Sequence, residues 1–257
     1  MGKISVNLVV HNEERIIKRC LDSLKNYVDE IIVVHDGPCS DKTLDICKKY
    51  NAKIFVKDFV GEAEPHRPFA LSKAIYEWVL ALDADEYLTE ELQKSLRKLV
   101  EGNFDGYSFI WPIYYKGKRI TKGPLSKNYR LVLFRKDKTS ISGVIHDWYK
   151  VKGVVKKTDL VLGHEPRGDL WTWKGFHKKD AKWARLQAER AVKEGKARYP
   201  SFFYIIKAFV WFFLVFIQSL FKGVFLNGVA GLRAMFFMCY YNFLINWYIF
   251  EVKVKRD

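Results

Sequence analysis

Two closely spaced carboxylates stand at the end of an apolar segment of this chain. Residues 78–82 (Trp-Val-Leu-Ala-Leu) lead directly into Asp83 and Asp85, with only Ala84 between them. In an extended chain, alternate side chains point the same way, so both carboxylates are expected to face one side. Carboxylate oxygens are ligands that Mg2+ and Mn2+ prefer, and such an ion can hold a diphosphate. The alternative is an acidic loop that caps a helix beginning near Thr89.

The elements that must position these carboxylates alternate between strand and helix. Short apolar segments typical of buried parallel strands occur at residues 4–10, 30–34 and 78–82, and a further strand is expected at residues 53–56. Segments with helical spacing lie between them, and Asn12 is expected to cap the first of these helices. This alternation predicts an α/β fold, with a doubly wound, mostly parallel sheet and helices on both faces.

Polar residues follow three of these strands. They are His11 to Glu13, His35-Asp36, and Asp83 to Glu86. In a doubly wound sheet, ligands bind beyond the carboxyl ends of the strands, where these residues would meet. The coincidence favours a ligand site over a plain acidic loop.

Past residue 100 the pattern changes. Strands are expected at residues 106–115, 129–135, 144–151 and 160–164, without helices between them. We interpret them as an added antiparallel or mixed segment laid over the first half. Polar side chains interrupt it at His146-Asp147 and at His164. One domain is therefore predicted over residues 1–166.

The overall charge limits the class of partner. The formal net charge of +15 implies attraction to nucleic acid, to a lipid headgroup surface or to a phosphorylated substrate. No sequence signature of nucleic-acid binding accompanies the charge, so no nucleic-acid partner is expected. Four cysteines without metal-binding spacing, and an N-terminus that enters a strand directly, indicate reduced thiols in a cytosolic compartment.

The last third of the chain, residues 167–257, predicts membrane association. Residues 167–198 hold ten Lys and Arg against four Asp and Glu, a net of +6. The apolar, aromatic-rich segment 202–221 follows, and crossing the hydrocarbon needs about 20 residues. A second apolar segment spans 225–250. A spanning hairpin would satisfy the positive-inside rule. The polar stripe of Lys207, Gln218 and Lys222 instead favours a helix lying in the interface or packed on a domain.

The ordered motifs resemble those of family 2 glycosyltransferases. Three segments carry the likeness: 4–14 with His-Asn-Glu-Glu, 29–43 with Val-Val-His-Asp-Gly, and 77–88 with Leu-Asp-Ala-Asp-Glu. Four later segments resemble the lipopolysaccharide-core β-glucosyltransferase-like subgroup: 130–135, 145–147, 162–164 and 224–228. The likeness runs over nearly the whole chain.

This resemblance implies a GT-A fold and inverting transfer from a nucleotide-activated sugar. Val10, Glu13, His35 and Asp36 are then expected to contact base and ribose, with Asp36 accepting a hydrogen bond from a uracil or guanine N–H. His35 departs from the Asp-Asp pair more usual in the family, and the following loop has one extra residue. A UDP- or GDP-sugar is expected as donor.

The remaining roles concern diphosphate, metal and acceptor. Asp85 is the first choice for direct ligation of Mn2+ or Mg2+, and Asp83 is assigned to ribose or a metal-bound water. Arg67 is expected to meet diphosphate oxygens, unless it is only a surface cation. Asp147 is the candidate general base, because it holds the position of the subgroup's Glu.

Two alternatives stay open at these positions. The alternative for Asp147 is a structural salt bridge within the added strands. The alternative for His164, which otherwise completes the metal site, is a buried core histidine. The resulting hypothesis is a membrane-associated, metal-dependent glycosyltransferase at the cytoplasmic face, peripheral, monotopic or hairpin-anchored. Its acceptor would be a lipid-linked glycan or glycolipid. The rivals are a polyprenyl-phosphate glycosyltransferase and a non-catalytic nucleotide-sugar-binding membrane protein.

Overall fold

The computed structural model of the chain describes residues 2–115, 117–144, 148–165 and 172–255. Two compact units divide the chain: Met1–Pro112 with Asn128–Glu165, and Ile113–Lys127 with Pro166–Asp257. Ile113–Lys127 groups with the C-terminal helices, although it lies between two strands of the first unit.

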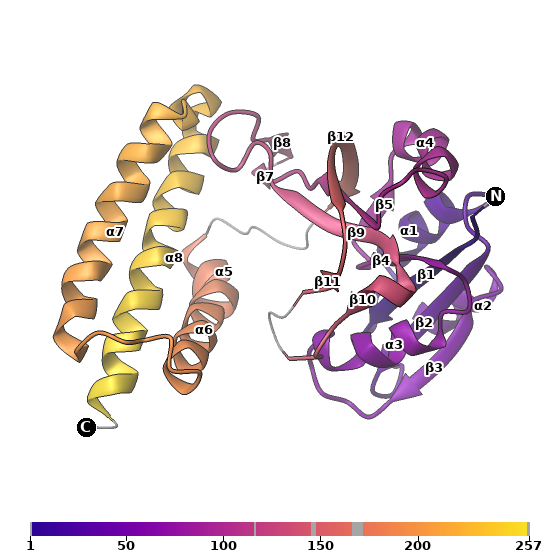
Figure 1. Cartoon of the computed structure of the whole chain (residues 1–257), viewed down its shortest axis with the longest axis horizontal. Helices are drawn as coiled ribbons and strands as arrows, with labels where there is room; N and C mark the ends of the chain where they lie inside the picture. Colours follow the sequence, from indigo (N-terminus) through magenta and orange to yellow (C-terminus); the bar gives the residue numbers. More distant parts are fainter. Residues whose placement is uncertain (1, 116, 145–147, 166–171, 256–257) are drawn as a thin grey trace. The chain divides into compact units, whose positions relative to one another are not determined.

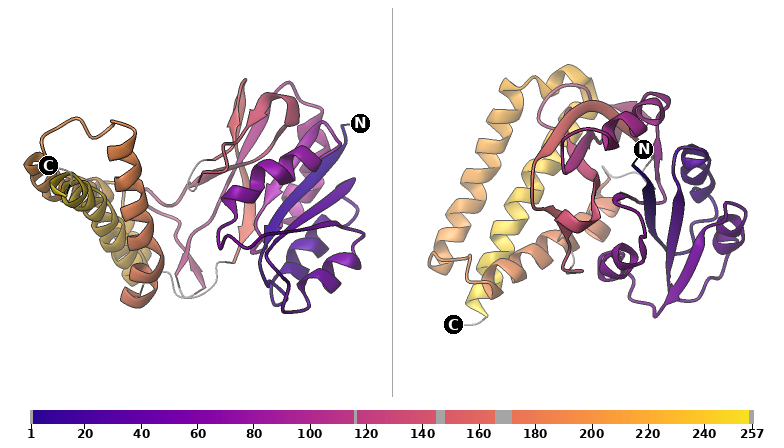
Figure 2. Two further views of the ribbon diagram at one scale, coloured as in Figure 1. Left: turned by 90° about the horizontal axis from the view of Figure 1, so that it is seen from below. Right: turned by 45° about the vertical axis from the view of Figure 1, so that its right-hand side comes forward.

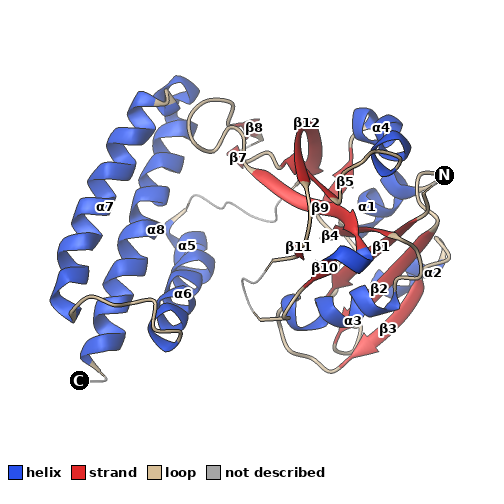
Figure 3. Cartoon of the chain, viewed as in Figure 1, coloured by secondary structure: helices blue, strands red, loops and turns tan. Residues whose placement is uncertain are grey.

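One sheet of eight strands forms the first unit (Figures 1 and 3). In spatial order the strands are β3 (Lys53–Lys57), β2 (Glu30–Asp36), β1 (Ile4–Val10), β4 (Trp78–Leu82), β9 (Tyr129–Arg135), β6 (Gly106–Ile110), β12 (Val155–His164) and β5 (Glu86–Leu88). The first four are parallel, as the alternating strands and helices predict. β9 runs antiparallel to β4 and β6, and β5 runs antiparallel to β12.

The sequence led us to expect the later strands to lie over the first half of the domain, and this expectation is wrong. They extend the same sheet sideways, since β9 pairs with the edge of β4. An unpaired edge of β4 would leave its backbone N–H and C=O groups without partners, and β9 satisfies them. A short hairpin of β10 (Thr139–Ser140) and β11 (Lys150–Val151) stands apart from the main sheet.

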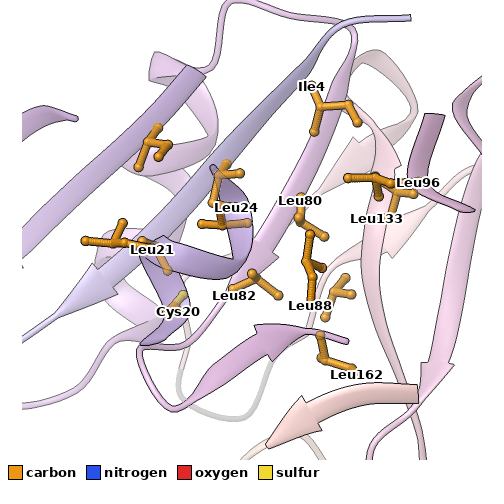
Figure 4. Close-up of a cluster of buried hydrophobic side chains, with 14 of the residues drawn as sticks. Ile4, Cys20, Leu21, Leu24, Leu80, Leu82, Leu88, Leu96, Leu133 and Leu162 are labelled. Carbon is orange, nitrogen blue, oxygen red and sulfur yellow. The ribbon is translucent and has the colours of Figure 1, made fainter. Parts of the chain in front are cut away.

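Alternating apolar side chains along the strands build a core on each face of the sheet. Ile4, Leu8 and Leu80 belong to the larger core, which is covered by α1 (Ile17–Leu24), α2 (Thr43–Lys48) and α4 (Glu90–Val100) (Figure 4). Val9 and Val79, one residue out of phase, belong to the core under α3 (Arg67–Lys73). The prediction of a mostly parallel sheet with helices on both faces is confirmed.

Asn12 does not cap the first helix. It adopts a left-handed backbone with φ of 52°, and α1 begins only at Ile17. Its side-chain oxygen instead accepts a hydrogen bond from the Ser40 N–H at 2.9 Å. Asparagine tolerates this backbone better than most residues, so it turns the chain sharply out of β1.

The second unit is largely helical. It holds α5 (Trp173–Phe176), the π turn η3 (His177–Ala181), α6 (Lys182–Lys193), α7 (Ser201–Phe221), the 3-10 turn η4 (Val224–Asn227) and α8 (Gly228–Val254). Helices α7 and α8 run side by side as a hairpin (Figure 2). The short strands β7 (Tyr114–Tyr115) and β8 (Lys118–Arg119) complete this unit.

Candidate active site

A tight turn at the end of β4 separates the two carboxylates. The Glu86 N–H donates to the Asp83 carbonyl at 3.0 Å, so residues 83–86 turn instead of staying extended. The expectation that both carboxylates face one side of an extended chain is therefore wrong. Asp83 points to two arginines, whereas Asp85 lies beside His164. The turn arises because β5 leaves β4 and pairs with β12.

Two arginines clamp the Asp83 carboxylate. Its Oδ1 accepts from the Arg67 guanidinium at 2.7 Å, and its Oδ2 accepts from Arg130 at 2.6 Å. The arginine side chains are only 6% and 13% exposed. Burial opposes ionisation of Asp83, but the charges of Arg130 and Arg67 outweigh it and hold its pKa well below the usual range.

This clamp changes the interpretation of Arg67. The residue is buried at the start of α3, so it is not a surface-loop cation. From the sequence, Arg130 was identified only as part of a strand motif, and no role at the site was assigned to it. A charged residue inside an apolar strand was the signal that would have identified it. Among the described residues, the Nε atoms of both arginines have no hydrogen-bond partner. Their donor capacity therefore exceeds what Asp83 uses.

Asp85 and His164 form the candidate metal pair. The His164 Nε2 lies 3.7 Å from the Asp85 Oδ2, and the His164 side chain is 4% exposed. The backbone brings them together, because the Glu165 N–H donates to the Asp85 carbonyl at 2.9 Å. The His164 Nδ1 faces the Pro112 carbonyl at 3.4 Å, which only accepts. A proton on Nδ1 satisfies this contact, and in the neutral ring that tautomer leaves the Nε2 lone pair directed toward Asp85 as a metal ligand.

This pair fits a divalent cation that shares its shell with substrate. Within the part of the chain that the structure describes, no cluster of three His, Cys, Asp or Glu side chains forms a complete protein cage. Mg2+ is ordinarily bound through one or two carboxylates together with waters and phosphate oxygens. One carboxylate and one imidazole at the edge of the sheet match that requirement, with the remaining positions left to a diphosphate.

Glu86 joins the arginine clamp to the metal pair, and sequence reasoning gave it no role. Its carboxylate accepts from the Trp111 Nε1 at 2.6 Å and pairs with Arg130 at 3.0 Å. Trp111 in turn stacks on the His164 ring, with 3.8 Å between ring centroids. Burial raises the pKa of Glu86 to about 8. Nothing local marks Glu86 as buried, because its environment comes from β9 and from the chain after β6.

The ends of β1 and β2 carry the residues predicted to bind base and ribose. Val10 is buried and pairs with His35 across the two strands. The His35 Nδ1 donates to the Gly37 carbonyl at 2.7 Å, and its Nε2 accepts from the Asn12 N–H at 3.3 Å. The Glu13 N–H donates to the Thr43 hydroxyl at 2.5 Å. These residues lie together at the carboxyl edge of the parallel strands.

Asp36 is committed to holding a loop. Its carboxylate accepts from the backbone N–H groups of Val60 at 2.7 Å and Gly61 at 2.8 Å, and from the His66 Nε2 at 2.8 Å. Burial opposes ionisation, but these hydrogen bonds outweigh it and lower the pKa of Asp36. The hydrogen bond from a nucleobase stays a prediction. Asp147, the residue predicted to act as the general base on the acceptor hydroxyl, lies outside the described residues.

The fold, with its candidate site at the carboxyl edge of the parallel strands, is that of a GT-A-like α/β domain. A model of the family described as Glycosyl transferase family 2 matches residues 5–150. An uncharacterized glycosyltransferase of Rickettsia typhi is 31% identical over 225 residues, which cover 83% of this chain and 76% of the relative. A second, from Rickettsia prowazekii, is 34% identical over 155 residues, 57% of this chain and 52% of the relative.

The chain also aligns with solved structures of low sequence identity. The crystal structure of Staphylococcus aureus TarS, residues 1–349, aligns with a TM-score of 0.46 and 17% identity, covering 99% of this chain and 91% of that one. Glucosyl-3-phosphoglycerate synthase of Mycobacterium tuberculosis aligns with a TM-score of 0.43 and 18% identity, covering 65% and 73%. On the family model and the Rickettsia typhi relative, the chain belongs to glycosyltransferase family 2 and is a nucleotide-sugar transferase.

Proposed function

We propose that this enzyme is a metal-dependent, inverting glycosyltransferase that acts on a lipid-linked glycan or glycolipid at the cytoplasmic face of the membrane. The observation that carries the metal dependence is the Asp85–His164 pair, whose Nε2 and Oδ2 atoms lie 3.7 Å apart beside the arginine clamp. Mn2+ and Mg2+ both suit this donor set.

A bound divalent ion would offset the negative charge that the leaving diphosphate gains. The protein side of that task belongs to Asp85 and His164 as ligands, and to Arg67 and Arg130. The two guanidinium groups carry two positive charges beside this pair, and Asp83 holds their orientation. A fixed cation of this kind stabilises developing charge without reorganising during the reaction.

We assign the donor's base and ribose to the edge formed by Val10, Glu13, His35 and Asp36. The Asp36 carboxylate already accepts three hydrogen bonds, so it positions the loop at residues 59–61. A direct contact with a uracil or guanine N–H would use the remaining lone pair of Oδ2. The loop held by Asp36 would then form part of the base pocket.

The acceptor side of the proposal rests on the C-terminal unit and on sequence. Two helices, Ser201–Phe221 and Val224–Val254, are long and apolar enough to meet a membrane. Large apolar side chains remain exposed along α7, including Phe202, Phe209 and Phe213. Asp147 is proposed as the base that activates the acceptor hydroxyl, and the order of the later motifs supports the lipopolysaccharide-core subgroup.

Asp85→Asn tests the metal site. Membrane fractions or purified enzyme are incubated with UDP- and GDP-sugars while Mn2+ or Mg2+ is titrated, and released nucleotide is measured. We expect loss of turnover by about 100-fold or more, the size associated with losing one stabilising group at developing charge. Asp45→Asn, on the exposed surface of α2, is the matched control. Metal-independent turnover at wild-type rate in Asp85→Asn contradicts the proposal.

Asp147→Asn separates the proposed activity from the polyprenyl-phosphate alternative. A hydroxyl acceptor needs a base, whereas a phosphate nucleophile is already ionised. We expect a loss of transfer with unchanged nucleotide-sugar binding. Near-normal transfer would favour a phosphate acceptor. Complete absence of turnover in the wild-type enzyme with every donor, despite donor binding, would favour the non-catalytic alternative.

A further inference from the structure

The tip of the α7–α8 hairpin is fastened to a basic segment of the chain. The Asn227 side-chain oxygen accepts from the N–H groups of Thr121 at 2.9 Å and Lys122 at 3.1 Å. Its amide nitrogen donates to the Lys122 carbonyl at 3.0 Å. Gly123, with φ of 85°, packs so closely that an added Cβ would lie 2.8 Å from the Val224 Cβ. These contacts all lie within the C-terminal unit.

The fastened segment is highly charged and short. Ile113–Lys127 contains five Lys and Arg residues and no Asp or Glu. Only Trp111 and Pro112 separate it from β6, and only Asn128 separates it from β9. Both of those strands belong to the catalytic sheet. The tip of the hairpin therefore has to stay on the same side of a membrane as that sheet.

The other end of the hairpin is held in the same way. The Lys253 Nζ, near the end of α8, donates to the Ala197 carbonyl in the connection before α7 at 2.9 Å. Ala188 of the basic helix α6 packs with Tyr204 and Ile249 of the hairpin. Charged, water-soluble parts of the chain are thus attached at both ends. A spanning hairpin would have to carry one of these ends through the hydrocarbon.

The exposed surface of α7 suits a helix that lies along a bilayer. At about 100° per residue, Phe202, Ile206, Phe209, Val210, Phe213 and Ile217 fall within an arc of about 100°. Each of these side chains is between 47% and 59% exposed. Lys207, Gln218 and Lys222 lie about 60–120° beyond one edge of this arc. An apolar face bordered by basic residues matches the hydrocarbon and anionic headgroups of a lipid surface.

We propose that the α7–α8 hairpin lies flat in the headgroup region of an anionic membrane and does not span it. The apolar face of α7, defined by the six residues above, enters the upper hydrocarbon. The described basic residues of the segment at the tip contact anionic headgroups; they are Lys118, Arg119, Lys122 and Lys127. This inference rests on the proposed membrane association. The sequence left open whether the apolar segments span the membrane or lie in its interface, and the contacts of the hairpin favour the interface.

Cysteine labelling on sealed liposomes tests the placement. Lys222→Cys marks the tip and Lys255→Cys marks the opposite end, in a Cys39→Ser background because the other three cysteines are buried. The full chain is bound to preformed liposomes of zwitterionic and anionic lipid and treated with a membrane-impermeant maleimide. We expect equal labelling at both positions without detergent. Protection of Lys222→Cys until detergent is added would overturn the flat placement.

A spin label at Val210→Cys gives a second measurement, because residue 210 is near the middle of α7. A flat helix places it about 5–10 Å below the headgroup boundary. A spanning helix places it near the bilayer centre, about 15 Å deep in a core of about 30 Å. Depth near the centre would overturn the proposal.

The apolar face itself is tested by Phe213→Ser, with Gln218→Ser as control on the polar edge of the same helix. We expect liposome partitioning to fall about tenfold for Phe213→Ser, from the burial of one phenyl ring, and less than twofold for the control. Equal partitioning of both variants would overturn the role of this face. Failure of the wild-type chain to bind liposomes would instead overturn membrane association, and a dimer that buries α7 would replace the membrane as its partner.

Discussion

Glu86→Gln tests whether a carboxyl group in the active-site network is protonated near neutral pH. Glu86 is fully buried, and burial raises its pKa from an ordinary value of 4.5 to about 8. A raised carboxyl pKa means that the folded protein binds more protons than the unfolded chain between these two values. Ionising Glu86 therefore costs stability progressively as the pH rises from about 4.5 to about 8.

The size of this effect follows from the same two values. A rise from 4.5 to about 8 corresponds to about 5 kcal/mol, at about 1.4 kcal/mol per pH unit. Burial outweighs the charge of Arg130 at 3.0 Å, which favours the carboxylate, and the Trp111 N–H donates to the same group at 2.6 Å. Glutamine keeps the shape of the side chain without an ionisable proton. We expect Glu86→Gln to match the wild type near pH 5 and to become the more stable protein toward pH 8.

Thermal unfolding measures this difference. At about 2–4 °C per kcal/mol for a domain of this size, about 5 kcal/mol corresponds to a rise of about 10–20 °C in the unfolding midpoint of Glu86→Gln relative to the wild type across the range. Glu91→Gln, on the exposed face of α4, controls for the change from carboxylate to amide. Infrared spectroscopy should detect a protonated carboxyl band near pH 6 that Glu86→Gln lacks. A difference that stays flat or falls with pH would refute the reasoning.

Three further perturbations test the surrounding geometry. In Gly163→Ala the new Cβ would lie 2.3 Å from the Tyr87 ring. We therefore expect the free energy of unfolding, measured by chemical denaturation, to fall by about 1–3 kcal/mol, and Mn2+ activation to weaken because His164 is the next residue. Unchanged stability and activation would contradict the packing of β12 on β5. Asp36→Asn should cost about 1–3 kcal/mol at neutral pH and raise KM for the donor. Because folding lowers the pKa of Asp36 from 3.8, the ionised carboxylate stabilises the folded protein above that value, and this stabilisation is lost as the pH falls further. A stability difference between Asp36→Asn and the wild type that does not shrink on acidification would contradict this role of Asp36. Arg67→Lys should lower kcat/KM about tenfold, since lysine lacks the planar fork that meets Asp83; full activity would remove Arg67 from the site.

The proposed membrane attachment would determine how the enzyme finds its acceptor. A hairpin lying flat keeps the catalytic unit and both hairpin ends on one side of the bilayer. An acceptor held in the same leaflet then meets the enzyme by diffusion along the surface, not from bulk solution. The basic segment Ile113–Lys127 is proposed to strengthen this attachment on anionic lipid, so binding should weaken as salt rises.

The sequence by itself determined the architecture of the parallel half of the sheet. Strands β1, β2 and β4 are short and buried on both faces, and the segments between them show helical spacing, so local patterns decide which side chains are buried. Polar residues at the ends of β1, β2 and β4 then had to meet at one edge. The order of strands and helices along the chain is therefore sufficient to place Asp85, His35 and Asp36 at that edge.

Only the tertiary structure decided what those side chains contact. Asp83 is held by Arg67 and Arg130, which lie 16 and 47 residues away in the chain. Asn227 meets Lys122 across 105 residues, and this contact favours a flat hairpin over a spanning one. The turn at residues 83–86 depends on β5 pairing with β12, which no local pattern encodes. Partners at such separations are selected by packing of the whole sheet and of the helical unit, whereas a sequence pattern reports only burial along its own segment.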